Sequence, residues 1–207
     1  MNARSMPAEI KEIGELYASI MTEVKFRVDF ILSTLNGTWA MARVAAFEFC
    51  YLQLRKICEL IALACVVAHG DIARNVRREY HAGVIMSRLG ALRPDFYPVP
   101  STQRLDQTTG QPVEIIKVED GFLSKEDLLQ LYGECGRFLH RNSVKRVRDG
   151  FKPDLDFERV RLWVDKIIAL LSQHSIQAGD PNVLFVVMMN EKQSGNVLFF
   201  PMLKTEP

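Results

Sequence analysis

Two long helical patterns joined by a short stop restrict the fold of this chain more than any other feature. In the first pattern the apolar residues recur at steps of three and four, which is the period of one buried helix face. They are Ile10, Ile13, Tyr17, Ile20, Val24, Val28, Ile31 and Leu35. Asn36-Gly37 ends the pattern, because glycine readily adopts the left-handed conformation that closes a helix. We therefore expect a helix over residues 8–35.

The second pattern, WAMARVAAFEFCYLQLRKICELIALACVVA, is apolar around much of its circumference, as in a helix that packs on several sides. Thr38 belongs to a residue type that caps helices, so we expect this helix over residues 38–68. Because the link between the patterns is short, the two helices must run in opposite directions. Residues 8–68 are thus expected to form a long helical hairpin, the start of an antiparallel helical bundle.

Three further helices are expected later in the chain. Gly70-Asp71 ends the second helix and begins a third. Ser124 and Asp127 resemble a capping box for a fourth helix, and Asp154 or Asp156 caps a fifth. These helices are expected over residues 72–90, 125–140 and 155–174.

Two other segments have the character of β-structure. Prolines in RPDFYPVP interrupt the helical pattern, and the following residues predict a β-ribbon insertion over about residues 95–121. Two apolar runs joined by NEKQSG predict a C-terminal β-hairpin over about residues 183–203. With 207 residues, 48% of them hydrophobic, the chain can bury a sizeable core. We expect a single domain over residues 1–207, of the α+β class and mainly α.

The cysteines and the apolar runs narrow the class of protein. Cys50, Cys58 and Cys65 are seven or eight residues apart on one expected helix, about 10–12 Å of rise, which exceeds the roughly 7 Å reach of a disulfide. With Cys135 they are expected to be reduced core residues, and no zinc-ligand spacing is present. The run ICELIALACVVA is too short for a membrane span of about twenty residues. We expect a cytoplasmic protein without membrane contact or cofactor.

One candidate site follows the fourth expected helix. From Arg137 to Arg148 the chain has five Lys or Arg residues and no acid, although its net charge is only +1. The imidazole of His140 is a candidate general acid or base, and the cations are candidate phosphate ligands. These cations are Arg137, Arg141, Lys145, Arg146 and Arg148, with Asn142 among them. The alternative is a basic helix end stabilised by the helix dipole.

The second candidate site is RNVRREYH in the third expected helix. Arg74 and His81 are seven residues apart and so share one helix face, with Asn75 adjacent to that face. Arg77 and Arg78 lie between them and are candidate ligands for a nucleic-acid backbone. The alternative is an ordinary solvated face with surface ion pairs.

Glu59 bears on the choice between these alternatives, because it has apolar neighbours on both sides. A buried carboxylate needs a cationic or hydrogen-bonded partner. We expect that partner to be Arg137 or Arg55, and a pair with Arg137 would take this arginine away from a ligand.

The helix order, together with LQLRKICELIALA and CGRFLHRN, resembles HEPN-like domains over about residues 8–92 and 124–174. In catalytic members an arginine, followed by a polar residue, is separated from a histidine by four to six intervening residues, and two copies meet in a homodimer that cleaves RNA without a metal. Arg74, Asn75 and His81 match that spacing but fall earlier in the helix order than the family motif. His140 falls at the expected place, but Arg137 precedes it by only two intervening residues.

The resemblance implies an RNA-associated homodimer, with metal-independent endoribonuclease activity in stress response, toxin-antitoxin function or phage defence. His81 or His140 would then transfer protons, and Arg74 or Arg141 would stabilise the phosphate. The alternative function is a non-catalytic dimeric module that binds a partner protein. In that case we expect the C-terminal hairpin to dock the partner through Phe185, Phe199 and Phe200.

Overall fold

The computed structural model describes residues 8–70, 79, 81–106, 108, 112–139, 148, 154–191 and 194–203. Its helices are α1 (Ala8–Leu35), α2 (Arg43–His69), α3 (Ala82–Leu92), α4 (Lys125–Leu139) and α6 (Phe157–Leu171). Its strands are β1 (Val99–Leu105), β2 (Pro112–Lys117), β3 (Gln173–Gln177), β4 (Val183–Met188) and β5 (Leu198–Leu203). The expected α+β class with mainly helical structure is therefore confirmed.

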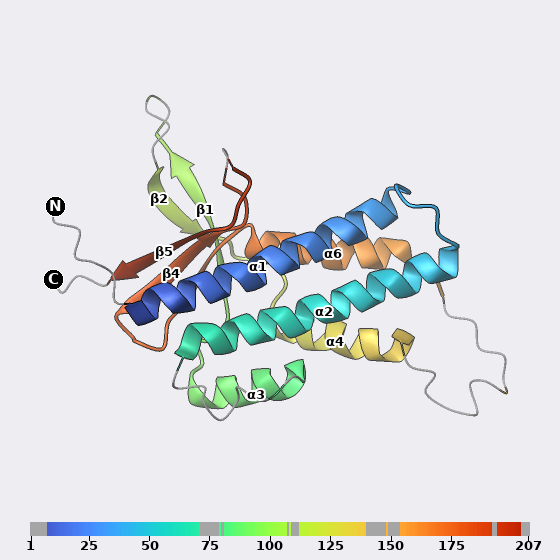
Figure 1. Ribbon diagram of the computed structural model, residues 1–207, viewed down its shortest axis with the longest axis horizontal. Coiled ribbons are helices and arrows are strands. Elements are labelled where there is room, and N and C mark those ends of the chain that lie inside the picture. The colour runs from blue at the N-terminus through green and yellow to red at the C-terminus, as the bar shows by residue number, and fades with distance from the viewer. Residues whose placement is uncertain are drawn as a thin grey trace.

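Helices α1 and α2 lie side by side and run in opposite directions, as expected (Figure 1). The stop at the end of α1 is a Schellman motif, in which Thr38 N–H donates to Ser33 O and Gly37 N–H donates to Thr34 O. Gly37 has the φ of +71° that this motif requires. The predicted end of α1 is therefore confirmed, and the left-handed conformation of Gly37 is its cause, as expected.

The predicted start of α2 is wrong by five residues. Thr38 closes α1 instead of capping α2, and Ala42 stands at the N-cap without a side-chain hydrogen bond. Trp39 explains the extra loop, because its ring packs 5.8 Å from the ring of Phe30 and 5.9 Å from that of Phe49. The connection therefore buries part of an aromatic side chain instead of continuing the helix.

Helix α3 also differs from its predicted extent. It begins at Ala82, with His81 in an extended conformation at the N-cap and Glu79 outside the helix. A continuous helix over residues 72–90 is therefore wrong, although residues 72–78 lie outside the described part of the chain. The capping box of α4 is confirmed, since Ser124 Oγ accepts from Asp127 N–H and the Asp127 carboxylate accepts from Ser124 N–H. Asp156 caps α6 by accepting from Arg159 N–H.

The strands form one antiparallel sheet in the order β2-β1-β3-β4-β5. The insertion and the C-terminal hairpin were expected as separate ribbons, and β3 joins them. This strand was missed, because the last helix was predicted to continue to residue 174 but ends at Leu171. The alternating burial of β3 inserts His174 and Ile176 into the core.

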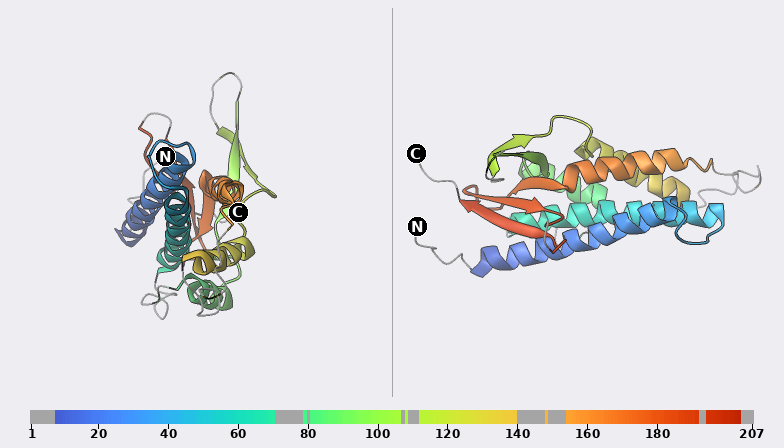
Figure 2. Two further views of the ribbon diagram at one scale, coloured as in Figure 1. Left: turned by 90° about the vertical axis from the view of Figure 1, so that its right-hand side faces the viewer. Right: turned by 90° about the horizontal axis from the view of Figure 1, so that it is seen from above.

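The sheet lies at the end of the helices where α1 begins and α2 ends (Figure 1 and Figure 2). Strand β5 packs on α1, with Phe199 directly over Gly14. The core centres on α2, which contacts α1, α3, α4 and α6. All four cysteines are free and buried, as expected. None of the helices in the described ranges has the length and apolar character needed to cross a bilayer.

Candidate functional site

Most of the predicted site residues fall outside the described part of the chain. This holds for Arg74, Asn75, Arg77 and Arg78 of RNVRREYH and for His140, Arg141, Asn142, Lys145 and Arg146 of the stretch after α4. Among the described residues are His81, Arg137 and Arg148, of which Arg148 is exposed. His81 and Arg137 are therefore the predicted site residues whose contacts are considered next.

His81 is exposed at the start of α3 and leans on α4. Its backbone N–H donates to Glu79 Oε1 at 3.1 Å, which fixes the turn that precedes the helix. Its imidazole meets the ring of Tyr132 edge to face, with ring centroids 5.0 Å apart and an interplanar angle of 82°. An aromatic contact of this kind positions the imidazole while leaving the residue accessible.

Tyr132 also connects His81 to a guanidinium on α2. The Arg55 guanidinium carbon lies 4.8 Å from the centroid of the Tyr132 ring, and its Nη2 donates to Tyr132 Oη at 3.1 Å. Burial raises the pKa of the Tyr132 phenol, and the charge of Arg55 offsets only part of this. The phenol is therefore protonated at neutral pH and accepts a hydrogen bond from Arg55 in a buried position.

Glu59 lies next to Arg55, and its contacts show which arginine is its partner. Its Oε1 accepts from Arg55 Nε at 3.2 Å and its Oε2 accepts from Lys56 Nζ at 2.9 Å. Of the two expected partners, Arg55 is therefore confirmed and Arg137 is wrong. We call His81, Tyr132, Arg55, Glu59 and Lys56 the His81 cluster.

Arg137 lies on α4, one turn beyond Tyr132. In the described part of the chain its ionic neighbour is Glu134, at 3.8 Å, and its side chain is 64% exposed. Glu134 already accepts from Arg159, Gln130 and Trp163. Because these donors satisfy the carboxylate and Arg137 makes no hydrogen bond to another described residue, its guanidinium can donate to an external ligand.

Hydrogen bonds at Glu134 hold α4, the helix that carries Tyr132, in place. Burial would raise the pKa of Glu134, but hydrogen bonds from Arg159, Gln130 and Trp163 outweigh it and hold this pKa below its ordinary value. Arg159 and Trp163 belong to α6, so the ionised carboxylate ties α4 to α6. This pairing keeps α4 fixed relative to the rest of the core.

The sequence did not identify Tyr132 or Arg55 as part of a site. Arg55 and Glu59 are four residues apart on a helix, so their pairing was visible in the sequence. The contact between Arg55 and Tyr132 spans 77 residues, and no local pattern indicates it. His81 and Lys56 are exposed, whereas Tyr132 is buried beneath them, so the surface offers a proton-transfer group and a cation over adjacent parts of α2 and α3.

We compared the chain with known protein families, curated proteins and solved structures. No family model, no curated protein and no solved structure matches the chain. We therefore infer the function from the geometry of the His81 cluster.

Proposed function

We propose that the protein is RNA-associated and that the His81 cluster is a metal-independent endoribonuclease site. The observation that carries this proposal is the exposed imidazole of His81 in edge contact with Tyr132, whose ring also holds Arg55. Imidazole, phenol and guanidinium together are sufficient for acid-base cleavage of a phosphodiester. The HEPN-like helix order described above is consistent with this proposal.

In the proposed reaction His81 accepts the proton of a ribose 2′-hydroxyl. The 2′-oxygen attacks the adjacent phosphorus and the bond from phosphorus to the 5′-oxygen breaks. The 5′-oxygen takes a proton from water, and the proton on His81 passes to the resulting hydroxide, which regenerates the imidazole. The products are a 2′,3′-cyclic phosphate and a 5′-hydroxyl, so no redox partner or metal is consumed. Tyr132 is buried, so its part is to position the His81 imidazole through the ring contact.

The charges around the cluster fit an RNA backbone. Lys56 is half exposed although it pairs with Glu59, and Arg137 is largely exposed with its donors available. Cations at the rim of a site attract a polyanion and hold its phosphates in register. In the described part of the chain, Arg137 is therefore an exposed cation on α4 that can hold a phosphate of a bound RNA.

The test is cleavage of single-stranded RNA by purified protein in the presence of EDTA. We expect His81→Ala to lower the cleavage rate by about 10²–10⁴-fold, the usual contribution of a general acid or base. Tyr132→Phe keeps the ring contact and loses only the phenol, so its smaller loss separates positioning from hydrogen bonding. Arg104→Gln on β1 is the matched control, since Arg104 is an exposed cation paired with Glu114. Absence of cleavage by the wild type, or full activity of His81→Ala, would overturn the proposal.

A second candidate function is a dimeric interaction module, and one surface favours it. Phe26, Phe30 and Trp39 are exposed, with Phe26 one helical turn before Phe30 on α1 and the rings of Phe30 and Trp39 5.8 Å apart. The expected docking surface on the C-terminal hairpin is wrong in part, because Phe185 is fully buried and Phe199 packs on it at 4.6 Å. Of the three expected phenylalanines only Phe200 is exposed.

Sedimentation velocity distinguishes this second function. If the surface mediates homodimerisation, Phe26→Ser with Trp39→Ser converts a dimer to a monomer, whereas Phe200→Ser alone does not. A wild-type protein that stays monomeric at all concentrations would exclude the homodimer.

A further inference from the structure

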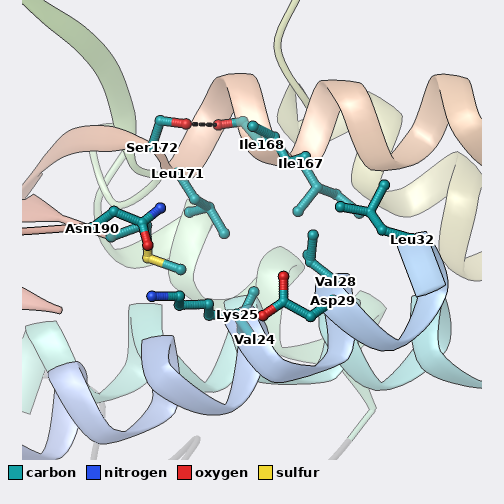
Figure 3. Close-up of a pocket in the computed structure, with 11 residues that line it drawn as sticks. Val24, Lys25, Val28, Asp29, Leu32, Ile167, Ile168, Leu171, Ser172 and Asn190 are labelled. Atoms are coloured by element: carbon teal, nitrogen blue, oxygen red, sulfur yellow. Dashed lines mark hydrogen bonds between the residues drawn. The ribbon is translucent and has the colours of Figure 1, made fainter. Parts of the chain in front are cut away.

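A cavity of about 230 Å³ lies between α1 and α6 (Figure 3). The residue following β4, Met189, and its neighbour Asn190 close one end. The cavity is small compared with sites of roughly 300–1,000 Å³ that hold drug-sized ligands. Its volume therefore suits a molecule with about as many atoms as an amino acid.

One end of this cavity is apolar. Figure 3 shows Val28 and Leu32 of α1 facing Ile167 of α6 across it. Ile168 also lines the cavity and is 38% exposed, although a branched apolar side chain on a helix facing the core is ordinarily buried. A ligand with an apolar tail would cover this surface and gain the free energy of removing it from water.

The other end carries three polar groups with hydrogen-bonding capacity. Figure 3 shows the Lys25 amine and the Asn190 amide at the same end, with the Asp29 carboxylate next along α1. Lys25 Nζ donates one hydrogen bond to Gly195 O, so two of its three donors remain. Asp29 is exposed and, within the described part of the chain, takes part in no hydrogen bond or ion pair.

We propose that this cavity binds a free α-amino acid with an aliphatic side chain. The carboxylate of the ligand would accept from Lys25 and Asn190, and its ammonium would donate to Asp29. Lys25 and Asp29 are four residues apart on one helix face and both line the cavity, so their opposite charges can pair with the two ends of one small zwitterion. The side chain of the ligand would lie between Leu32 and Ile167.

The presence of both charges excludes simpler amphiphiles. A fatty acid would bring its carboxylate toward Asp29, and an alkylamine would bring its ammonium toward Lys25. Each would leave one protein charge without a partner and place it near a like charge, which lowers affinity. A zwitterion satisfies both, so the site discriminates by charge pattern as well as by the fit of the tail.

Isothermal titration calorimetry with three matched compounds tests this assignment. L-leucine carries both charges, 4-methylpentanoate lacks its amine, and 3-methylbutylamine lacks its carboxylate. We expect L-leucine to bind and the other two to bind about tenfold more weakly or worse, as for the loss of one charge-assisted hydrogen bond. Equal binding of 4-methylpentanoate, or no binding of L-leucine at millimolar concentration, would overturn the proposal.

Variants locate the binding to this cavity. Asp29→Asn and Lys25→Gln remove one charge each from exposed or half-exposed positions, and each is expected to weaken L-leucine binding about tenfold or more. Ile168→Trp fills the apolar end from a partly exposed position and should abolish binding while the protein stays folded. Glu9→Gln, in a separate cavity beside His69, is the matched control and should bind as the wild type. Unchanged affinity in Ile168→Trp would place any binding elsewhere and reject the site.

Discussion

The Oη of Tyr17 lies 2.9 Å from Nε2 of His174, and both side chains are fully buried. Nδ1 of His174 lies 3.0 Å from Leu171 O, and a carbonyl oxygen can only accept. Nδ1 therefore carries the proton, and Nε2 accepts from the Tyr17 hydroxyl. This pair ties α1 to β3 across 157 residues of chain.

The hydrogen bond predicts a specific cost for removing one hydroxyl. Tyr17→Phe keeps the ring but leaves Nε2 of His174 without a donor in the core. We expect the free energy of unfolding to fall by about 1–3 kcal/mol, the penalty for a buried polar atom that loses its partner. Urea denaturation followed by circular dichroism measures this difference. An unchanged midpoint would show that the pair contributes nothing to stability.

The burial of His174 predicts how stability depends on pH. Desolvation lowers the pKa of His174 from 6.5 to about 4, and the hydrogen bond to Leu171 opposes this only in part. The unfolded chain therefore binds a proton between pH 6.5 and 4 that the native protein does not. The stabilisation is fully present above pH 6.5 and is lost progressively as the pH falls to about 4, by on the order of 3 kcal/mol.

Denaturation curves recorded across this pH range test the prediction. His174→Gln is the informative variant, because its amide can both donate and accept but does not titrate. The variant should show a flatter dependence than the wild type between pH 6.5 and 4. Burial also lowers the pKa of His69, so some dependence of the same sign should remain. Identical slopes in the two proteins would contradict the assignment of the effect to His174.

Local patterns predicted the elements whose ends are set by neighbouring residues. The stop after α1, the capping box at Ser124 and the cap at Asp156 each depend on contacts within a few residues. Strand β3 was missed because its pairing with β1 and β4 is non-local. The start of α2 was misplaced for a similar reason, since the packing of Trp39 on Phe30 and Phe49 determines it.

The sequence predicted which kinds of residue the candidate site contains, but not how these residues are arranged in space. His81 and Arg137 were visible as an imidazole and a cation in basic surroundings. Their relation to Tyr132 and Arg55 depends on how α2, α3 and α4 pack, which no single-helix pattern contains. The cavity beside Asp29 was not identified either, because its two walls belong to helices more than one hundred residues apart in the chain.

Glu134 predicts a second measurable loss of stability. Glu134→Gln removes the charge that pairs with Arg159 while keeping the shape of the side chain. We expect a loss of about 1–3 kcal/mol, below the cost of breaking a fully buried pair, because Arg159 is about one-third exposed and water screens its charge. Fluorescence of Trp163, whose Nε1 donates to Glu134 at 3.0 Å, reports the change directly. Glu126→Gln, at an exposed position on the same helix, should leave stability unchanged within experimental error.

Two glycines predict opposite effects of the same substitution. A Cβ on Gly179 would lie 2.6 Å from the backbone oxygen of His69, and Gly179 N–H donates to Ala68 O at 3.0 Å. Gly179→Ala must therefore displace the connection between β3 and β4 from the end of α2, at a cost of about 1–3 kcal/mol.

Gly133 lies in the exposed interior of α4 with nothing within 4 Å of its would-be Cβ. Gly133→Ala should instead stabilise the protein by about 1 kcal/mol, because alanine loses less backbone entropy in a helix. Thermal denaturation of both variants against the wild type measures the two shifts, and a Gly179→Ala protein as stable as the wild type would mean that β3, β4 and α2 are not in close contact in solution.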